Sequence, residues 1–152
     1  MTSTSEPLAV ALQVARALER LGIPYLLGGS LASGIHGEPR ATLDVDFAVH
    51  LTPTQAQDLA LELQDEFHVV ADALVEAARE EGTVNVVHKR PFLKVDLHVR
   101  PRSGHHREEM LRASRMQVGD SPDDALRVAT TEDVVLSKLR RYRLGGDVSD
   151  RQ

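Results

Sequence analysis

Some segments of this chain space their apolar residues as a helix does, and others as a strand does. The pattern predicts most of the helices and strands. Helical spacing or capping signals predict helices over 7–21, 53–66, 72–81, 105–113 and 131–144, and a short helix ending near residue 35. Short apolar or alternating runs predict strands over 23–27, 44–51, 83–88 and 92–99, with weaker candidates at 67–70, 115–118 and 126–129. This order predicts an α/β (α+β) fold, a mixed β-sheet flanked by helices.

The length of the chain predicts a single domain over 1–152. A chain of 152 residues has the usual size of one domain, and it contains no repeat or interdomain linker. Gly145 and Gly146 are expected to end the last helix near Leu144. The tail 145–152 then reads as a new helix start capped by Ser149, so we expect it to be frayed or cut from a longer protein.

Composition limits the compartment and the chemistry. The chain has no cysteine, which excludes disulfides and thiolate metal sites and fits a reducing cytosol. No apolar run reaches the roughly 20 residues of a membrane span. The N-terminus lacks the basic flank and apolar core of a secretory signal. We therefore expect a cytoplasmic protein of bacterial type without a membrane partner.

The charge of −5 is unevenly distributed between the two halves. Residues 1–82 carry 4 basic and 13 acidic side chains, and residues 83–152 carry 14 basic and 10 acidic ones. A basic half beside an acidic half suggests an anionic ligand held on one side. Chance clustering on a solvated surface is the alternative.

Three aspartates on strands are the first candidates for chemistry. Asp44 and Asp46 are two residues apart on a predicted strand, so both side chains leave the same face. Two adjacent carboxylates repel each other unless a cation or solvent compensates them, and Mg²⁺ prefers such oxygen ligands. Asp96 lies on the polar face of another strand. If the strands pair, three carboxylates converge and suit two metal ions.

The turn Gly28-Gly29-Ser30 is the second candidate. Glycines let the backbone turn tightly and approach a ligand, and the amides of the following helix start can bind phosphate. Each signal alone has an ordinary alternative. The aspartate pair could be solvated, the serine could be a helix cap, and Asp96 could pair with Lys94 or Arg100.

Taken together, GGS, thirteen residues, DVD and then FLKVDLHV resemble the nucleotidyltransferase superfamily with its DNA polymerase beta-like fold. LLGGSLASGIHGEPRATLDVDFAV and TTEDVVLSKLRRYR look most similar to AbiEii toxin-type small bacterial nucleotidyltransferases. The resemblance covers about residues 8–144.

The resemblance implies roles for individual residues. Gly28, Gly29 and Ser30 match the turn that holds nucleotide phosphates. Asp44 and Asp46 match the catalytic metal-binding pair. Asp96 matches the third catalytic and metal-binding acid, which aligns or deprotonates the attacking hydroxyl. Lys138 matches a helix lysine expected to reach the triphosphate.

Other polar residues allow both a chemical and a simpler role. Arg40 could contact phosphate or orient Asp46, or it could be solvated in its loop. The basic residues of KLRRYR could bind triphosphate or RNA, or form a solvated helix face. His98 and the pair His105 and His106 could suggest zinc, but without cysteine or a helical His-x₃-His spacing we do not expect it.

These residues predict a Mg²⁺-dependent enzyme that moves a nucleoside monophosphate from a nucleoside triphosphate to a hydroxyl. Two Mg²⁺ ions are expected, with Mn²⁺ as a substitute. The acceptor could be tRNA or another RNA, a protein or a small molecule. A toxin role would add a cognate antitoxin as partner. A catalytically silent nucleotide-binding module and a metal-dependent phosphohydrolase are the alternatives.

Overall fold

The computed structural model describes residues 6–35 and 44–150, with side chains described except at 30, 33, 34 and 141–150. Its strands are β1 (Tyr25–Gly28), β2 (Asp44–Val49), β3 (Phe67–His68), β4 (Thr83–His88), β5 (Lys94–Val99), β6 (Ser114–Gln117) and β7 (Ala125–Val128). Its helices are α1 (Glu6–Arg20), α2 (Gly29–Ile35), α3 (Pro53–Leu63), α4 (Ala71–Glu80), α5 (Gly104–Arg112) and α6 (Thr131–Asp150). The predicted mixed α/β fold is confirmed.

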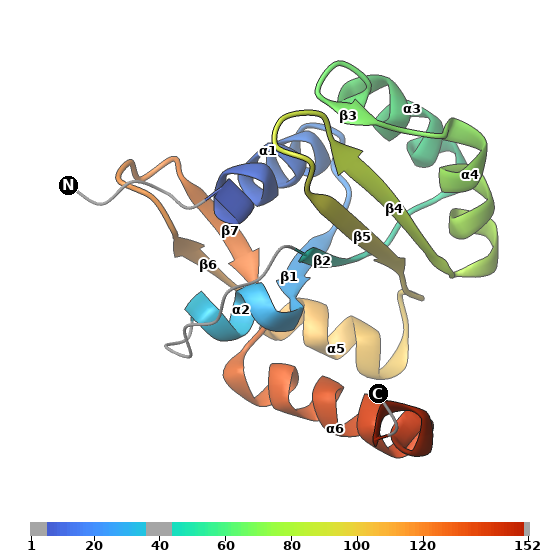
Figure 1. The fold of residues 1–152 in the computed structure, drawn as a ribbon, viewed down its shortest axis with the longest axis vertical. Helices are drawn as coiled ribbons and strands as arrows, with labels where there is room; N and C mark the ends of the chain where they lie inside the picture. Colours follow the sequence, from blue (N-terminus) through green and yellow to red (C-terminus); the bar gives the residue numbers. More distant parts are fainter. Residues whose placement is uncertain (1–5, 36–43, 151–152) are drawn as a thin grey trace.

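The strands form one seven-stranded sheet in the order β3-β4-β5-β2-β1-β7-β6. The pairs β2–β5 and β1–β7 are parallel, and the other neighbours are antiparallel. Figure 1 shows α1, α3 and α4 on one side of the sheet and α2, α5 and α6 on the other. The central strands β1, β2 and β5 therefore lie between two layers of helices.

Alternation along β2 separates the core from the polar face. Val45, Phe47 and Val49 are fully buried, whereas Asp44 is exposed and Asp46 is half-buried. Phe47 contacts the Tyr25 ring edge-on, with ring centroids 5.7 Å apart. Strand β5 has the same burial alternation. A slip of one residue in either strand would turn its aspartates into the core, so burial of the apolar face fixes which residues face the site.

Local signals explain where α3 begins and where α4 ends. The Thr52 hydroxyl accepts a hydrogen bond from the Gln55 amide, and the Gln55 side chain accepts one from the Thr52 amide, which completes a capping box. Helix α4 ends at Glu81, which adopts a left-handed conformation at φ 54°. The predicted starts and ends of these helices agree with the structure to within a few residues.

The predicted end of the last helix is wrong. Helix α6 continues through Gly145 and Gly146 to Asp150, so residues up to 150 do not form a separate helix start. A glycine inside a helix costs about 1 kcal/mol, which neighbouring turns can tolerate. Gly-Gly is therefore a weaker stop signal than the prediction assumed.

Within the described ranges, no helix combines the length and the apolar character that crossing a membrane would require.

Candidate active site

Asp46 and Asp96 lie directly opposite each other on adjacent strands. The parallel pairing of β2 and β5 places Asp46 beside Asp96, and the antiparallel pairing of β1 and β2 places Gly28 beside Asp46. Neighbouring strands are about 4.8 Å apart, so the two carboxylates leave the same face as near neighbours. The condition set for the convergence of the carboxylates, that the two strands pair, is met, and it brings together residues 50 positions apart in sequence.

His98 completes this group from the same strand as Asp96. Its Nε2 lies 3.1 Å from Asp46 Oδ1, and its Nδ1 lies 2.9 Å from the Thr83 hydroxyl. One carboxylate oxygen each from Asp46 and Asp96 and one His98 nitrogen all lie within 4.8 Å of one another. Contacts on both ring nitrogens fix the orientation of the imidazole toward Asp46.

Asp44 lies at the edge of this group. It starts β2, is exposed, and lies beside Lys94 in the strand register. Lys94 Nζ is 3.6 Å from Asp96 Oδ2. The structure therefore brings Asp46 and Asp96 together with His98, while Asp44 lies two residues before Asp46 on the same face of β2, outside the three-residue group.

Gly29 packs its backbone against the Asp46 side chain. Its φ is +67°, a left-handed conformation that glycine adopts without strain. A Cβ at this position would lie 3.1 Å from Asp46 Cγ and 3.2 Å from Asp46 Cβ, and closer still to Oδ2. The turn between β1 and α2 can therefore approach the carboxylate only because residue 29 has no side chain.

A pocket of about 360 Å³ opens beside these residues. It lies against β1, β2 and β5 and is closed by α5 and α6, which Figure 1 shows on the same side of the sheet. Its polar lining comes from Asp46, His98, Arg100, His105, His106, Glu109, Asp133, Ser137 and Arg140, and both Gly28 and Gly29 contribute backbone. The volume suits a small ligand or part of a nucleotide.

Burial and ion pairs organise the far wall of the pocket. Asp133 is 2% exposed, and its two oxygens accept hydrogen bonds from Arg112 at 2.8 and 2.9 Å. The hydrogen bond from Arg112 lowers the pKa of the Asp133 carboxyl. The buried, paired Asp133 is thus a fixed acidic group in a pocket that Arg100 and Arg140 also line.

The described structure does not bring three of the predicted phosphate-binding residues into the pocket. Arg40 lies outside the described residues, and the side chain of Ser30 lies outside the described part. Lys138 is exposed on α6 and is not among the residues that line the pocket, whereas Arg140 is. The phosphate roles of these three residues remain predictions.

Two parts of the site were not assigned from the sequence. His98 is two residues from Asp96, the same spacing that linked Asp44 to Asp46, so strand alternation could have identified it. Arg140 lies in the basic run of α6, but only the packing of α6 shows which base faces the pocket.

The donor atoms of Asp46, Asp96 and His98 fit a divalent cation. Two carboxylates supply the hard oxygen ligands that Mg²⁺ and Mn²⁺ prefer. The His98 nitrogen is a softer donor and is more compatible with Mn²⁺ than with Mg²⁺.

No protein-family model matches this chain, and no curated protein matches it. Solved structures do resemble it. A Thermotoga maritima protein assigned to the nucleotidyltransferases superposes with a TM-score of 0.61 at 14% identity, over 99% of this chain and 93% of that one. An antigenic nucleotidyltransferase-like protein from Paracoccidioides brasiliensis gives 0.59 at 19% identity, over 93% of this chain and 69% of that one.

The lincosamide antibiotic adenylyltransferase LnuA, with lincomycin bound, gives a TM-score of 0.55 at 14% identity, over 89% of this chain and 86% of that one. At such identities the likeness concerns the fold. The chain therefore has a nucleotidyltransferase-like fold, as its sequence predicted.

Proposed function

We propose that this protein is a nucleotidyltransferase that moves a nucleoside monophosphate from a nucleoside triphosphate to a hydroxyl acceptor. One observation carries the proposal: Gly29, directly after β1, lies against Asp46 of β2, which in turn lies beside Asp96 of β5. A backbone turn for phosphate beside a carboxylate pair for metal is the arrangement that such a transfer requires.

In the proposed reaction, the acceptor hydroxyl attacks the α-phosphorus of the nucleotide. Asp96 accepts the hydroxyl proton, a new phosphate ester bond forms, and the bond to the β-phosphate breaks to release pyrophosphate. Mg²⁺ held by Asp46 and Asp96, with Asp44 contributing to a second ion, would neutralise the triphosphate charge. The rest of the catalysis is positioning, for which the strands provide a rigid base.

Arg140 and the backbone at Gly28 and Gly29 line the pocket, and they are proposed to contact phosphate. Ser30 is proposed to add a hydroxyl donor, and Arg40 and Lys138 to add positive charge. Arg140 lines the pocket and Lys138 does not, so Arg140 joins Lys138 as a candidate for the triphosphate contact.

The acceptor is the finer part of the proposal. RNA such as tRNA, a protein hydroxyl and a small molecule all present the required nucleophile. LnuA, of the same fold, is an adenylyltransferase of a lincosamide antibiotic. The AbiEii-type sequence resemblance instead favours an RNA or protein acceptor in the cytoplasm, with a cognate antitoxin as the regulatory partner.

Transfer from each nucleoside triphosphate labelled at the α-phosphate tests this function. The protein is incubated with Mg²⁺ and, in separate reactions, total tRNA, cell lysate protein and a panel of small hydroxyl compounds. We expect label in one acceptor class with wild type and at least about 100-fold less with Asp46→Asn. Asp58→Asn, on the exposed face of α3 across the sheet, is the matched control.

Three results would overturn the proposal. Equal labelling by wild type and Asp46→Asn would remove the metal carboxylate from the reaction. Nucleotide binding by calorimetry without label in any acceptor would favour the silent binding module. Release of inorganic phosphate from a model ester without any nucleotide would favour the phosphohydrolase.

A further inference from the structure

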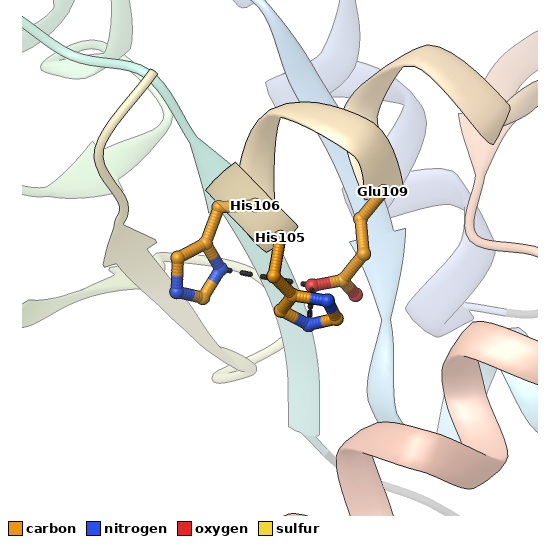
Figure 2. A group of neighbouring side chains, drawn as sticks. All are labelled: His105, His106 and Glu109. Carbon is orange, nitrogen blue, oxygen red and sulfur yellow. Dashed lines mark ion pairs between the residues drawn. The ribbon is translucent and has the colours of Figure 1, made fainter. Parts of the chain in front are cut away.

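A second group of metal-ligating side chains lies on α5, across the pocket from Asp46. His105, His106 and Glu109 project from the first turns of this helix toward one another, and Figure 2 shows both imidazoles directed at the Glu109 carboxylate. His105 Nε2 lies 2.6 Å from Glu109 Oε1, and His106 Nδ1 lies 3.6 Å from the same oxygen. One ligand atom from each residue lies within 4.8 Å of the other two.

The spacing of these residues explains why they converge. His105 and Glu109 are four residues apart, so they lie one above the other on the helix, and His106 is adjacent to that face. No His-x₃-His spacing, the usual helical zinc pattern, occurs in this chain. The His-x₃-Glu spacing of His105 and Glu109 places its two donors with the same geometry.

The local environment keeps the ligand atoms available. All three residues are half-buried in the pocket lining. A half-buried carboxylate such as that of Glu109 favours a positively charged partner.

We propose that His105, His106 and Glu109 form a binding site for a transition-metal dication of the Zn²⁺ class, separate from the carboxylate pair of Asp46 and Asp96. Two imidazole nitrogens and one carboxylate oxygen are ligands that Zn²⁺ prefers over Mg²⁺. Ligand bonds of about 2.0–2.2 Å require donors roughly 3.3 Å apart. When a metal binds, the 2.6 Å contact between His105 Nε2 and Glu109 Oε1 would lengthen and the 3.6 Å contact between His106 Nδ1 and Glu109 Oε1 would shorten.

The position of the site defines what a bound metal would contact. Three protein ligands leave one tetrahedral position open, and the group lines the same pocket as Asp46 and His98. The open position therefore faces a space where water or an oxygen of a bound molecule can complete the coordination. The inference concerns the α5 residues and does not depend on nucleotidyl transfer.

Co²⁺ and Zn²⁺ binding test the proposal. Titrations are carried out with excess Mg²⁺ and in the Asp46→Asn variant, so that the carboxylate pair does not compete. We expect visible Co²⁺ absorption of a four- or five-coordinate site and one equivalent of Zn²⁺ by calorimetry. Loss of a direct ligand in His105→Gln or Glu109→Gln should weaken Zn²⁺ binding at least about 10-fold, since even outer partners of metal ligands contribute that much.

Glu108→Gln is the matched control. It changes the neighbouring carboxylate on the same helix, whose side chain is 68% exposed and belongs to no such group. We expect it to bind Zn²⁺ as the parent does. Equal Zn²⁺ affinity in all the variants, with unchanged circular dichroism spectra, would overturn the proposal. So would a Co²⁺ spectrum of a purely octahedral, oxygen-ligated ion.

Discussion

Substitution of Gly29 by alanine would test how closely the Gly29 turn and the Asp46 carboxylate depend on each other. The backbone at residue 29 has φ +67°, and an added Cβ would overlap the Asp46 carboxylate and lie 3.1 Å from its Cγ. Ordinary carbon contacts are about 3.5–4.0 Å. Asp46 would therefore have to rotate away, which would break its contact with His98.

Two effects of this substitution can be separated by magnitude. An alanine in the left-handed region costs about 1–2 kcal/mol, and the more restricted unfolded chain returns about 0.4–1 kcal/mol. We therefore expect a loss of roughly 1 kcal/mol in the free energy of unfolding, or about 2–4 °C in melting temperature. In the proposed reaction, displacement of the Asp46 carboxylate by about 1 Å should lower transfer about 100-fold.

Gly22 provides the matched control. It has φ +69°, but nothing lies within 4 Å of an added Cβ. Gly22→Ala should show a similar loss of stability in thermal unfolding and full transfer of the α-labelled nucleotide. If Gly29→Ala retained full transfer, or if Gly22→Ala lost it equally, the argument from close approach would be refuted.

Two further predictions concern stability. Asp133→Asn should lower the free energy of unfolding by about 1.5–3 kcal/mol at neutral pH, because Arg112 loses a charge-assisted pair. The pKa of Asp133 is lowered in the folded protein, so the stability that wild type gains over Asp133→Asn is complete above the ordinary carboxyl pKa of 3.8. It disappears as the pH falls through the lowered pKa of the folded state. Urea unfolding that gives the same stability difference between the two proteins at pH 7 and at pH 2.5 would contradict this. Tyr25→Phe should cost about 1–3 kcal/mol in the same assay, because the hydroxyl donates to Glu19 and accepts from the Arg127 amide; an unchanged melting temperature would refute the account of this contact.

The sequence predicted the elements of the site because strand alternation is a local property. Asp44 and Asp46 were placed on one face of β2, and Asp96 on the polar face of β5, from hydrophobic spacing alone. That β5 pairs with β2 was a conditional expectation. The register that puts Asp46 opposite Asp96 depends on how the whole sheet assembles, and no local signal contains it.

Features that depend on tertiary packing were not predictable in this way. The approach of Gly29 to Asp46 requires the positions of two strands, and the pocket requires the placement of α5 and α6. Asp133 stands in the first turn of α6, where an acidic residue is common, yet it is buried and paired with Arg112. Such residues gain their role from partners distant in the sequence.

The comparison of α- and γ-labelled nucleoside triphosphates tests the central claim most directly. With Mg²⁺ and an accepting substrate, wild type should transfer label from the α-phosphate to the acceptor and release γ-label only within pyrophosphate. Asp46→Asn should do neither. Transfer of γ-label to the acceptor, or release of free γ-phosphate without α-label in any product, would contradict the assignment of this site to nucleotidyl transfer.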